Sequence, residues 1–103
     1  MVNILSMSGH GGQAFLLPYC TSKGALALLM TNTACSVMRH NIRVNGLNIG
    51  WMNTPGENRI QQEYHGRKVG WQQEAEAGLP FGRMLKTDEV ARAVAFYAPM
   101  NPE

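Results

Sequence analysis

The fold that this chain can adopt is constrained most by two short apolar runs, which are separated by one long helix-forming stretch. The first run, MVNILS (1–6), has the composition of a short buried strand. The second, IRVNGLNI (42–49), alternates apolar and polar residues with one phase slip at Gly46. Between them, residues 19–39 are good helix formers, and Pro18 suits a first helical turn. Strand, helix and strand make a β-α-β unit, whose two strands are expected to be parallel.

The rest of the chain is predicted to be loops and helices. Residues 57–77 are polar and weakly helical, and two glycines interrupt them, so mobility is expected there. A final helix is predicted over 87–98, because Thr87 can cap it and Asp88 and Glu89 suit the positive end of its dipole. Loops are predicted over 8–17, 50–56 and 78–86. This pattern indicates an α/β fold with a parallel sheet.

Composition narrows the class of protein. With 103 residues, of which 45% are hydrophobic and 16% charged, the chain fits one folded domain. A net charge of +2 without a basic block gives little support to nucleic-acid binding. Cys20 and Cys35 form no Cys-x-x-Cys pair and are expected to be reduced packing residues. No apolar run is expected to span a membrane and no signal segment is visible, so a cytoplasmic protein is predicted.

The long helix is apolar almost all round, which predicts burial on two sides, by its own domain and by a partner subunit. The three histidines have no ligand spacing, so no metal site is predicted. Trp51 and Trp71 are candidates either for the lining of a substrate site or for ordinary packing.

The stretch PYCTSKG (18–24) places Tyr19 and Lys23 one helical turn apart on the same face. An ammonium group and a helix N-terminus nearby both favour the phenolate form of a tyrosine, as general acid/base chemistry requires. A Tyr-x-x-x-Lys spacing alone also arises by chance. Here, however, Ser6 ends the first strand, and Gly50 and Thr54 follow the second. All of these residues are therefore predicted at the carboxyl edge of one parallel sheet, where α/β proteins bind ligands.

These segments resemble the short-chain dehydrogenase/reductases. That family's pattern is roughly N-I-S-S-x-x-G, then Y-x-x-S-K-x-A, then I-R-V-N-x-[IL]-x-P-G-x-x-x-T. The corresponding segments here are NILSMSG, YCTSKGA and IRVNGLNIGWMNT, and LPFGRMLKTDEVARAVAFYA resembles the loop and helix before the family's last strand. The resemblance covers nearly the whole chain and implies a Rossmann-like doubly wound parallel sheet, of which residues 1–103 would form the carboxyl-side part.

The resemblance also implies roles for three catalytic residues. Tyr19 matches the general acid/base, which exchanges a proton with the substrate oxygen while hydride moves at the nicotinamide. Lys23 matches the residue that favours the phenolate and hydrogen-bonds the nicotinamide ribose. Ser6 matches the hydroxyl that orients the substrate carbonyl, as an oxyanion donor would; its spacing to Tyr19 favours it over Ser8. Ser6 and Tyr19 would thus contact the substrate, a small alcohol or carbonyl compound, and Tyr19 and Lys23 would contact the cofactor, NAD or NADP.

Further positions match the nicotinamide-binding segment and the substrate flap. Thr54, with Gly50 and the backbone at Ile49 and Met52, matches the clamp on the nicotinamide carboxamide. Residues 53–77 match the variable substrate-binding flap, an expected lid. Ile49 departs from the family pattern, which has proline at this position.

The sequence contains no T-G-x-x-x-G-x-G turn for the cofactor pyrophosphate. The chain is therefore expected to be a fragment cut at both ends and inactive alone, whereas the full-length enzyme would be a homo-oligomer. Two alternatives remain open at this point. One is a non-catalytic module that pairs subunits through the apolar helix, and the other is a small helical protein whose motifs are accidental.

Overall fold

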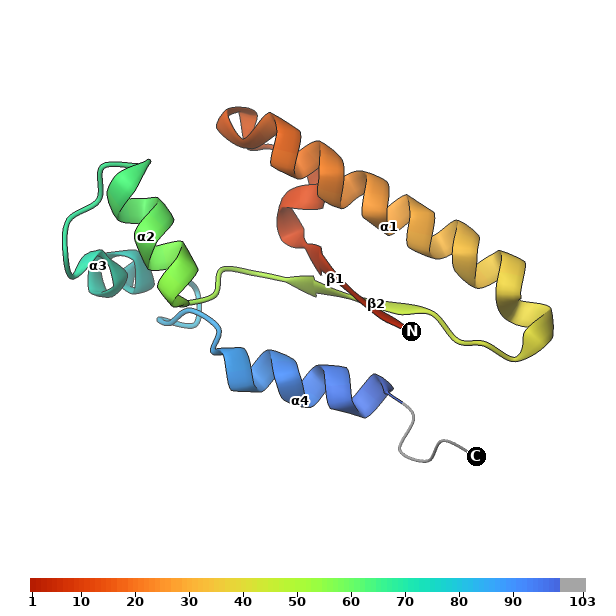
Figure 1. Cartoon of the computed structure of the whole chain (residues 1–103). Coiled ribbons are helices and arrows are strands. Elements are labelled where there is room, and N and C mark those ends of the chain that lie inside the picture. Colours follow the sequence, from red (N-terminus) through yellow and green to blue (C-terminus); the bar gives the residue numbers. More distant parts are fainter. Residues whose placement is uncertain (99–103) are drawn as a thin grey trace. The chain divides into compact units, whose positions relative to one another are not determined.

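The computed structural model describes residues 1–98 of the chain (Figure 1). It divides into two compact units, one formed by Met1–Ile49 with the chain from Arg92 onward, and the other by Gly50–Ala91. The helices and strands are β1 (Val2–Ser6), η1 (Met7–His10), η2 (Ala14–Leu16), α1 (Leu17–Val37), η3 (Met38–His40), β2 (Asn45–Ile49), α2 (Pro55–Glu63), α3 (Trp71–Ala77) and α4 (Thr87–Tyr97), where η denotes a 3-10 turn.

The predicted β-α-β unit is confirmed. β1 and β2 form a parallel two-stranded sheet, in which Val2 pairs with Asn45 and Ser6 pairs with Ile49. The helix α1 connects them and packs on both strands. The second strand is shorter than predicted, because residues 42–44 lie outside the ladder. The two chain segments stay together there through the terminal amino group of Met1, which donates to the Arg43 carbonyl oxygen at 2.9 Å.

The phase slip at Gly46 has a packing cause. A β-carbon at this position would lie 2.7 Å from Cδ1 of Leu5 and would overlap Sδ of Met30. Leu5 is one of the most buried side chains, at 4% exposure. Gly46 therefore lies on the sheet face that α1 covers, and its missing side chain lets the helix approach the strands closely.

The helix α1 begins as predicted, with proline in its first turn. One side of the helix packs on β1 and β2 and is half-buried, none of its residues is fully buried within residues 1–98, and burial by a partner subunit stays a prediction. Contrary to the expectation from sequence, the helical stretch Ala14–His40 is long and apolar enough to cross a membrane by length and composition alone. Core helices of soluble proteins meet the same criterion. Large apolar side chains on α1 that are more than 60% exposed are Leu17, Leu28 and Leu29.

The second unit contains the segment predicted to be weakly helical. It forms two short helices, α2 and α3, separated by a turn that includes Gly66 and Gly70, both with positive φ. Trp51 and Trp71 stack with ring centroids 5.4 Å apart, and Trp71 is only 3% exposed. Packing is confirmed for Trp71, which is buried as Met84 is, whereas Trp51 is half-buried and its assignment to a substrate site stays a prediction.

Candidate active site

Ser6 lies at the carboxyl end of β1, directly beside Ile49 at the end of β2. Its backbone is extended, and its Oγ accepts a hydrogen bond of 3.1 Å from the backbone N–H of Ser8. This contact caps the η1 turn and occupies a lone pair of the hydroxyl. The hydroxyl proton of Ser6 stays available for donation, as a group that stabilises an oxyanion must be.

Tyr19 lies in the first turn of α1, with 45% of the residue exposed. Lys23 follows one turn later, and its Nζ is 5.9 Å from the centroid of the Tyr19 ring. The same ammonium donates a 3.0 Å hydrogen bond to the Ile4 carbonyl oxygen. Lys23 therefore links the start of α1 to the last residues of β1, which places Tyr19, Lys23 and Ser6 at one edge of the first unit.

A close approach of two glycines makes this arrangement possible. A β-carbon on Gly9, in the η1 turn, would lie 3.1 Å from the backbone nitrogen of Gly24 and 3.2 Å from the carbonyl carbon of Lys23. A β-carbon on Gly24 would lie 3.1 Å from the Gly9 carbonyl oxygen. The glycine that follows Lys23 thus lets the turn after Ser6 pack against the helix that carries Tyr19.

Sequence reasoning missed a side chain that bridges the two sides of this edge. The carboxamide oxygen of Gln13 accepts a 2.6 Å hydrogen bond from Ser8 Oγ and lies 4.0 Å from the thiol of Cys20. Gln13 therefore contacts Ser8, two residues after Ser6, and Cys20, the residue that follows Tyr19. No motif spacing signals this contact. Cys20 and Cys35 are both unbridged, and Cys35 is exposed rather than packed within the described residues.

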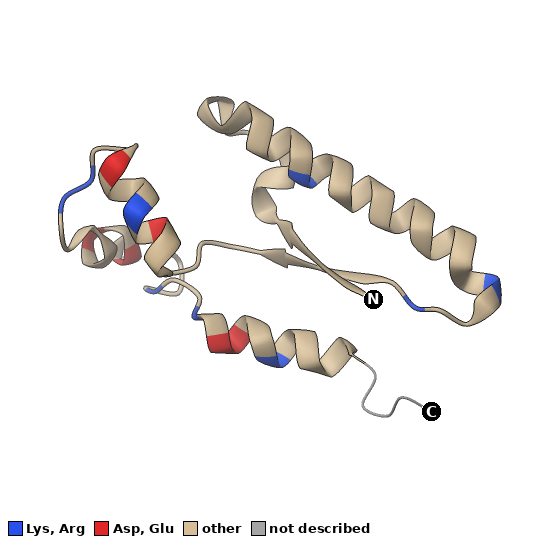
Figure 2. Cartoon of the chain, viewed as in Figure 1, with Lys and Arg blue, Asp and Glu red and all other residues tan. Residues whose placement is uncertain are grey.

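Charge is distributed unevenly along the chain (Figure 2). The first 49 residues contain Lys23, Arg39 and Arg43 but no acidic residue, and all seven acidic residues come later. Because Tyr19 lies in this acid-free stretch, the charges of residues 1–49 favour an anionic ligand over a cationic one.

The residues predicted to hold the nicotinamide belong mostly to the second unit. Leu85 N–H donates to the Trp51 carbonyl oxygen at 2.9 Å, and Asn53 N–H donates to the Leu85 carbonyl oxygen at 3.0 Å. This isolated parallel bridge pairs Leu85 with Met52. In such a bridge the N–H and C=O of Met52 itself point away from Leu85, which leaves both groups available to a ligand.

Thr54 directly follows this bridge and is the N-cap of α2. Its Oγ1 accepts a 3.0 Å hydrogen bond from the Glu57 N–H, as an N-cap side chain does. Its hydroxyl proton remains free to donate. Gly50 is exposed at the start of the same segment. Ile49, Tyr19, Lys23 and Ser6 lie in the first unit, whereas Gly50, Met52 and Thr54 lie in the second.

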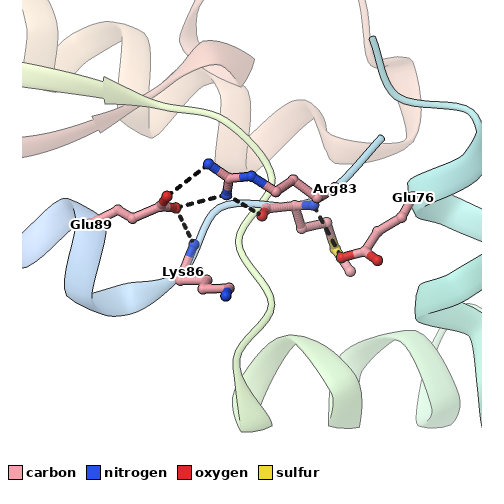
Figure 3. A network of polar contacts seen from close by, with 5 residues as sticks. Glu76, Arg83, Lys86 and Glu89 are labelled. Atoms are coloured by element: carbon pink, nitrogen blue, oxygen red, sulfur yellow. Dashed lines mark hydrogen bonds and ion pairs between the residues drawn. The ribbon is translucent and has the colours of Figure 1, made fainter. Parts of the chain in front are cut away.

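Arg83 and Glu89 form an ion pair that sequence reasoning did not identify. Arg83 binds both oxygens of the Glu89 carboxylate, at 2.7 and 2.9 Å (Figure 3). This bidentate contact and the Lys86 N–H lower the pKa of Glu89 from its ordinary 4.5 to about 2. From sequence, Glu89 was assigned only to the helix dipole, because no spacing rule connects it to an arginine six residues earlier.

Comparison with known proteins identifies the protein family to which a chain with this fold and this candidate site belongs. A family profile described as Enoyl-(Acyl carrier protein) reductase matches residues 1–99. The chain belongs to the short-chain dehydrogenase/reductase family, as its motifs predicted.

Three relatives support this assignment. Short-chain dehydrogenase fogB of Aspergillus ruber (strain CBS 135680) is 34% identical over 98 residues, which are 95% of this chain and 34% of that protein. The structure of an NAD+-bound xylitol dehydrogenase matches with a TM-score of 0.77 and 29% identity, covering 92% of this chain and 40% of that one. The structure of YwfH, an NADPH dependent reductase involved in bacilysin biosynthesis, matches with a TM-score of 0.83 at 23% identity, covering 96% of this chain and 39% of that one, and supports the Rossmann-like fold alone. The chain thus spans well under half the length of these relatives.

Proposed function

We propose that this chain carries the proton-transfer centre of an NAD(P)-dependent oxidoreductase that interconverts an alcohol and its ketone or aldehyde. The observation that supports this best is the position of Lys23, whose ammonium joins the end of β1 to the helix turn that bears Tyr19. Relatives named as dehydrogenases and reductases favour this function over the alternative of a non-catalytic pairing module.

In the proposed reduction, the Ser6 hydroxyl donates a hydrogen bond to the substrate carbonyl oxygen. Tyr19 then gives its phenolic proton to that oxygen, while Lys23 stabilises the phenolate that remains. The nicotinamide, when bound, supplies the hydride that reaches the carbonyl carbon. In the oxidation, Tyr19 takes the hydroxyl proton back.

The residues present fit the nicotinamide end of the cofactor. Met52 offers a free backbone N–H and C=O, and Thr54 offers a hydroxyl proton. We infer that the pyrophosphate is bound by a glycine-rich turn outside these 103 residues, since the sequence holds none. The proposal leaves NAD and NADP both open.

We further propose a small polyol or related alcohol as substrate, a cytoplasmic location and a homo-oligomeric enzyme. Xylitol dehydrogenase is among the structural relatives, which favours a polyol. The helix α1 packs on the two-stranded sheet and carries Lys23 on its sheet-facing side, which favours a subunit interface over a membrane for its exposed apolar side.

Replacing Tyr19 by phenylalanine tests the proposed acid/base role. In the protein produced from the gene that encodes this chain, turnover should fall by roughly 100-fold or more, since general acid/base catalysis contributes about this much. Cofactor affinity should stay nearly unchanged. Tyr97→Phe in α4 is the matched control and should leave turnover intact. Substantial turnover in the Tyr19→Phe variant would refute the assigned role.

Titration of the 103-residue chain with NADH and NADPH by calorimetry tests the cofactor proposal. We expect no measurable binding, because the pyrophosphate contributes a large share of dinucleotide affinity through a helix N-terminus that this chain lacks. Micromolar affinity would contradict the proposal that the glycine-rich turn is needed.

A further inference from the structure

Arg83 and Glu89 belong to a polar network outside the residues proposed for catalysis and cofactor binding. Besides the bidentate ion pair, Arg83 Nη1 donates to the Met84 carbonyl oxygen at 3.2 Å. Glu89 also accepts from the backbone N–H of Lys86 at 2.9 Å. The two side chains of the ion pair therefore bind backbone groups of Met84 and Lys86, the residues on either side of Leu85; Figure 3 shows this network.

Met84 is fixed independently from the other side of the network. Its N–H donates a 3.2 Å hydrogen bond to the Glu76 carboxylate of α3, and its side chain is only 2% exposed. The segment 84–86 is thus held by two carboxylates, one arginine and one buried side chain. Such an anchored backbone has little freedom to shift relative to its neighbours.

Leu85 transmits this anchoring to the segment that follows β2. Its N–H and C=O bind the Trp51 carbonyl oxygen and the Asn53 N–H, as described above. Since a parallel bridge uses the flanking groups of the partner segment, the orientation of Met52 depends on where Leu85 lies. Thr54 lies two residues after Met52 and is the N-cap of α2, so its position also depends on where Leu85 lies.

We propose that Arg83 and Glu89 are positioning residues, which hold Leu85 so that the N–H and C=O of Met52 and the hydroxyl of Thr54 face the nicotinamide carboxamide. The proposal rests on the function proposed above, because it concerns the same site. Arg83 and Glu89 touch neither substrate nor cofactor and act only through Leu85. Loss of the ion pair therefore weakens cofactor binding more than it slows proton transfer at Tyr19.

Hydrogen exchange measured by NMR tests the structural step without any cofactor. Glu89→Gln should reduce the protection factors of the Leu85 and Asn53 amides by about tenfold or more, because these hydrogen bonds then open locally. Glu63→Gln is the matched control. It removes a carboxylate from the exposed Arg59–Glu63 pair at 3.2 Å, which is not linked to the bridge, and should leave both amides unchanged.

Steady-state kinetics of the protein produced from the native gene test the functional step. Glu89→Gln should raise KM for the nicotinamide cofactor by roughly tenfold, with kcat changed by about twofold or less, since small displacements of binding groups have large effects. Arg83→Lys keeps the charge but loses the bidentate contact, and its KM should fall between those of the wild type and Glu89→Gln. A merely structural role would lower the amount of folded enzyme and would leave KM unchanged.

The two proposals fail in different ways. An active wild type whose Glu89→Gln variant keeps both the cofactor KM and the amide protection overturns the positioning role and leaves the oxidoreductase function intact. A wild type without NAD(P)-dependent activity overturns the function, while the exchange data still decide whether the ion pair fixes the bridge. If Glu89→Gln does not fold, the same measurements on Arg83→Lys decide the matter, and unchanged amides in that variant refute the proposal.

Discussion

Single glycines decide how closely the elements of the first unit approach. Gly46 makes room for Leu5 and Met30 between the sheet and α1, and Gly9 and Gly24 bring the turn after Ser6 against the helix that bears Tyr19. None of these three needs a left-handed backbone, since each is required for its missing side chain. The position of the proposed catalytic groups therefore depends on residues that have no reactive side chain.

Gly46→Ala should destabilise the chain by about 1–3 kcal/mol, the usual effect of overpacking a core. The new methyl group would lie 2.7 Å from Leu5 Cδ1, so side chains or the helix must shift. Urea denaturation followed by circular dichroism measures the change. Gly56→Ala is the matched control, because its β-carbon meets nothing closer than Thr54 Oγ1 at 3.9 Å and alanine favours helix α2. Equal stability of Gly46→Ala and wild type would contradict the close approach.

The Glu89 carboxylate makes the second unit sensitive to acid. Its pKa is lowered in the folded chain from its ordinary 4.5 to about 2 by the Arg83 contact. A lowered pKa stabilises the fold above the ordinary value, and this stabilisation is lost as pH falls from 4.5 toward 2. We expect the stability advantage of wild type over Glu89→Gln to shrink across this interval in urea titrations at stepped pH. A constant difference would show that the charge of Glu89 does not contribute.

At the scale of elements, the segment predicted to be only weakly helical forms two helices, α2 and α3. Glu57 accepts hydrogen bonds from Trp51 Nε1 at 3.0 Å and from Gln61 Nε2 at 2.7 Å, and Asn58 accepts one from Trp71 Nε1 at 2.9 Å. The polar residues that weaken helix propensity thus bind the tryptophan edges. Local propensity could not reveal this order, because it comes from contacts between α2, α3 and the segment before them.

Trp71→Ala should destabilise the second unit by roughly 3–5 kcal/mol, the range for removing a large buried aromatic side chain. Trp71 is 3% exposed and stacks on Trp51, so the substitution leaves a cavity and removes an aromatic pair. Thermal unfolding followed by the fluorescence of Trp51 measures the loss. Phe81→Ala, at a residue 93% exposed, should change little. A small effect of Trp71→Ala would mean that the stack does not stabilise the second unit.

For the whole molecule, the order of elements and the parallel pairing could be predicted from periodicity and from the proline and glycine positions. The edge that gathers Ser6, Tyr19 and Lys23 followed from the same pattern, because strand ends and helix starts meet there in a β-α-β unit. The Gln13 contact and the Arg83–Glu89 network could not be predicted. They join side chains whose separation in sequence matches no helical or strand period.

The exposed apolar face of α1 predicts self-association of the chain. Leu28 and Leu29 are 64% and 61% exposed, and an apolar surface of this kind is normally covered by another protein surface. Sedimentation should show dimers or larger species, and the double substitution Leu28→Asp with Leu29→Asp should shift them toward monomer. Val69→Asp, at a residue 90% exposed in the second unit, is the control. A wild-type monomer would contradict this prediction.

The register of β1 and β2 has a consequence for how errors in folding would show themselves. Ser6 and Ile49 end their strands side by side, and Leu5, the residue before Ser6, is buried at 4% exposure. A slip of one residue would turn Leu5 to the opposite face and would carry Ser6 away from Tyr19 in the same motion. A chain with a misplaced serine would therefore also expose a core leucine. The register that buries Leu5 is thus the same register that places Ser6 near Tyr19. A molecule with the wrong register would expose apolar surface, the feature by which misfolded proteins are recognised in cells.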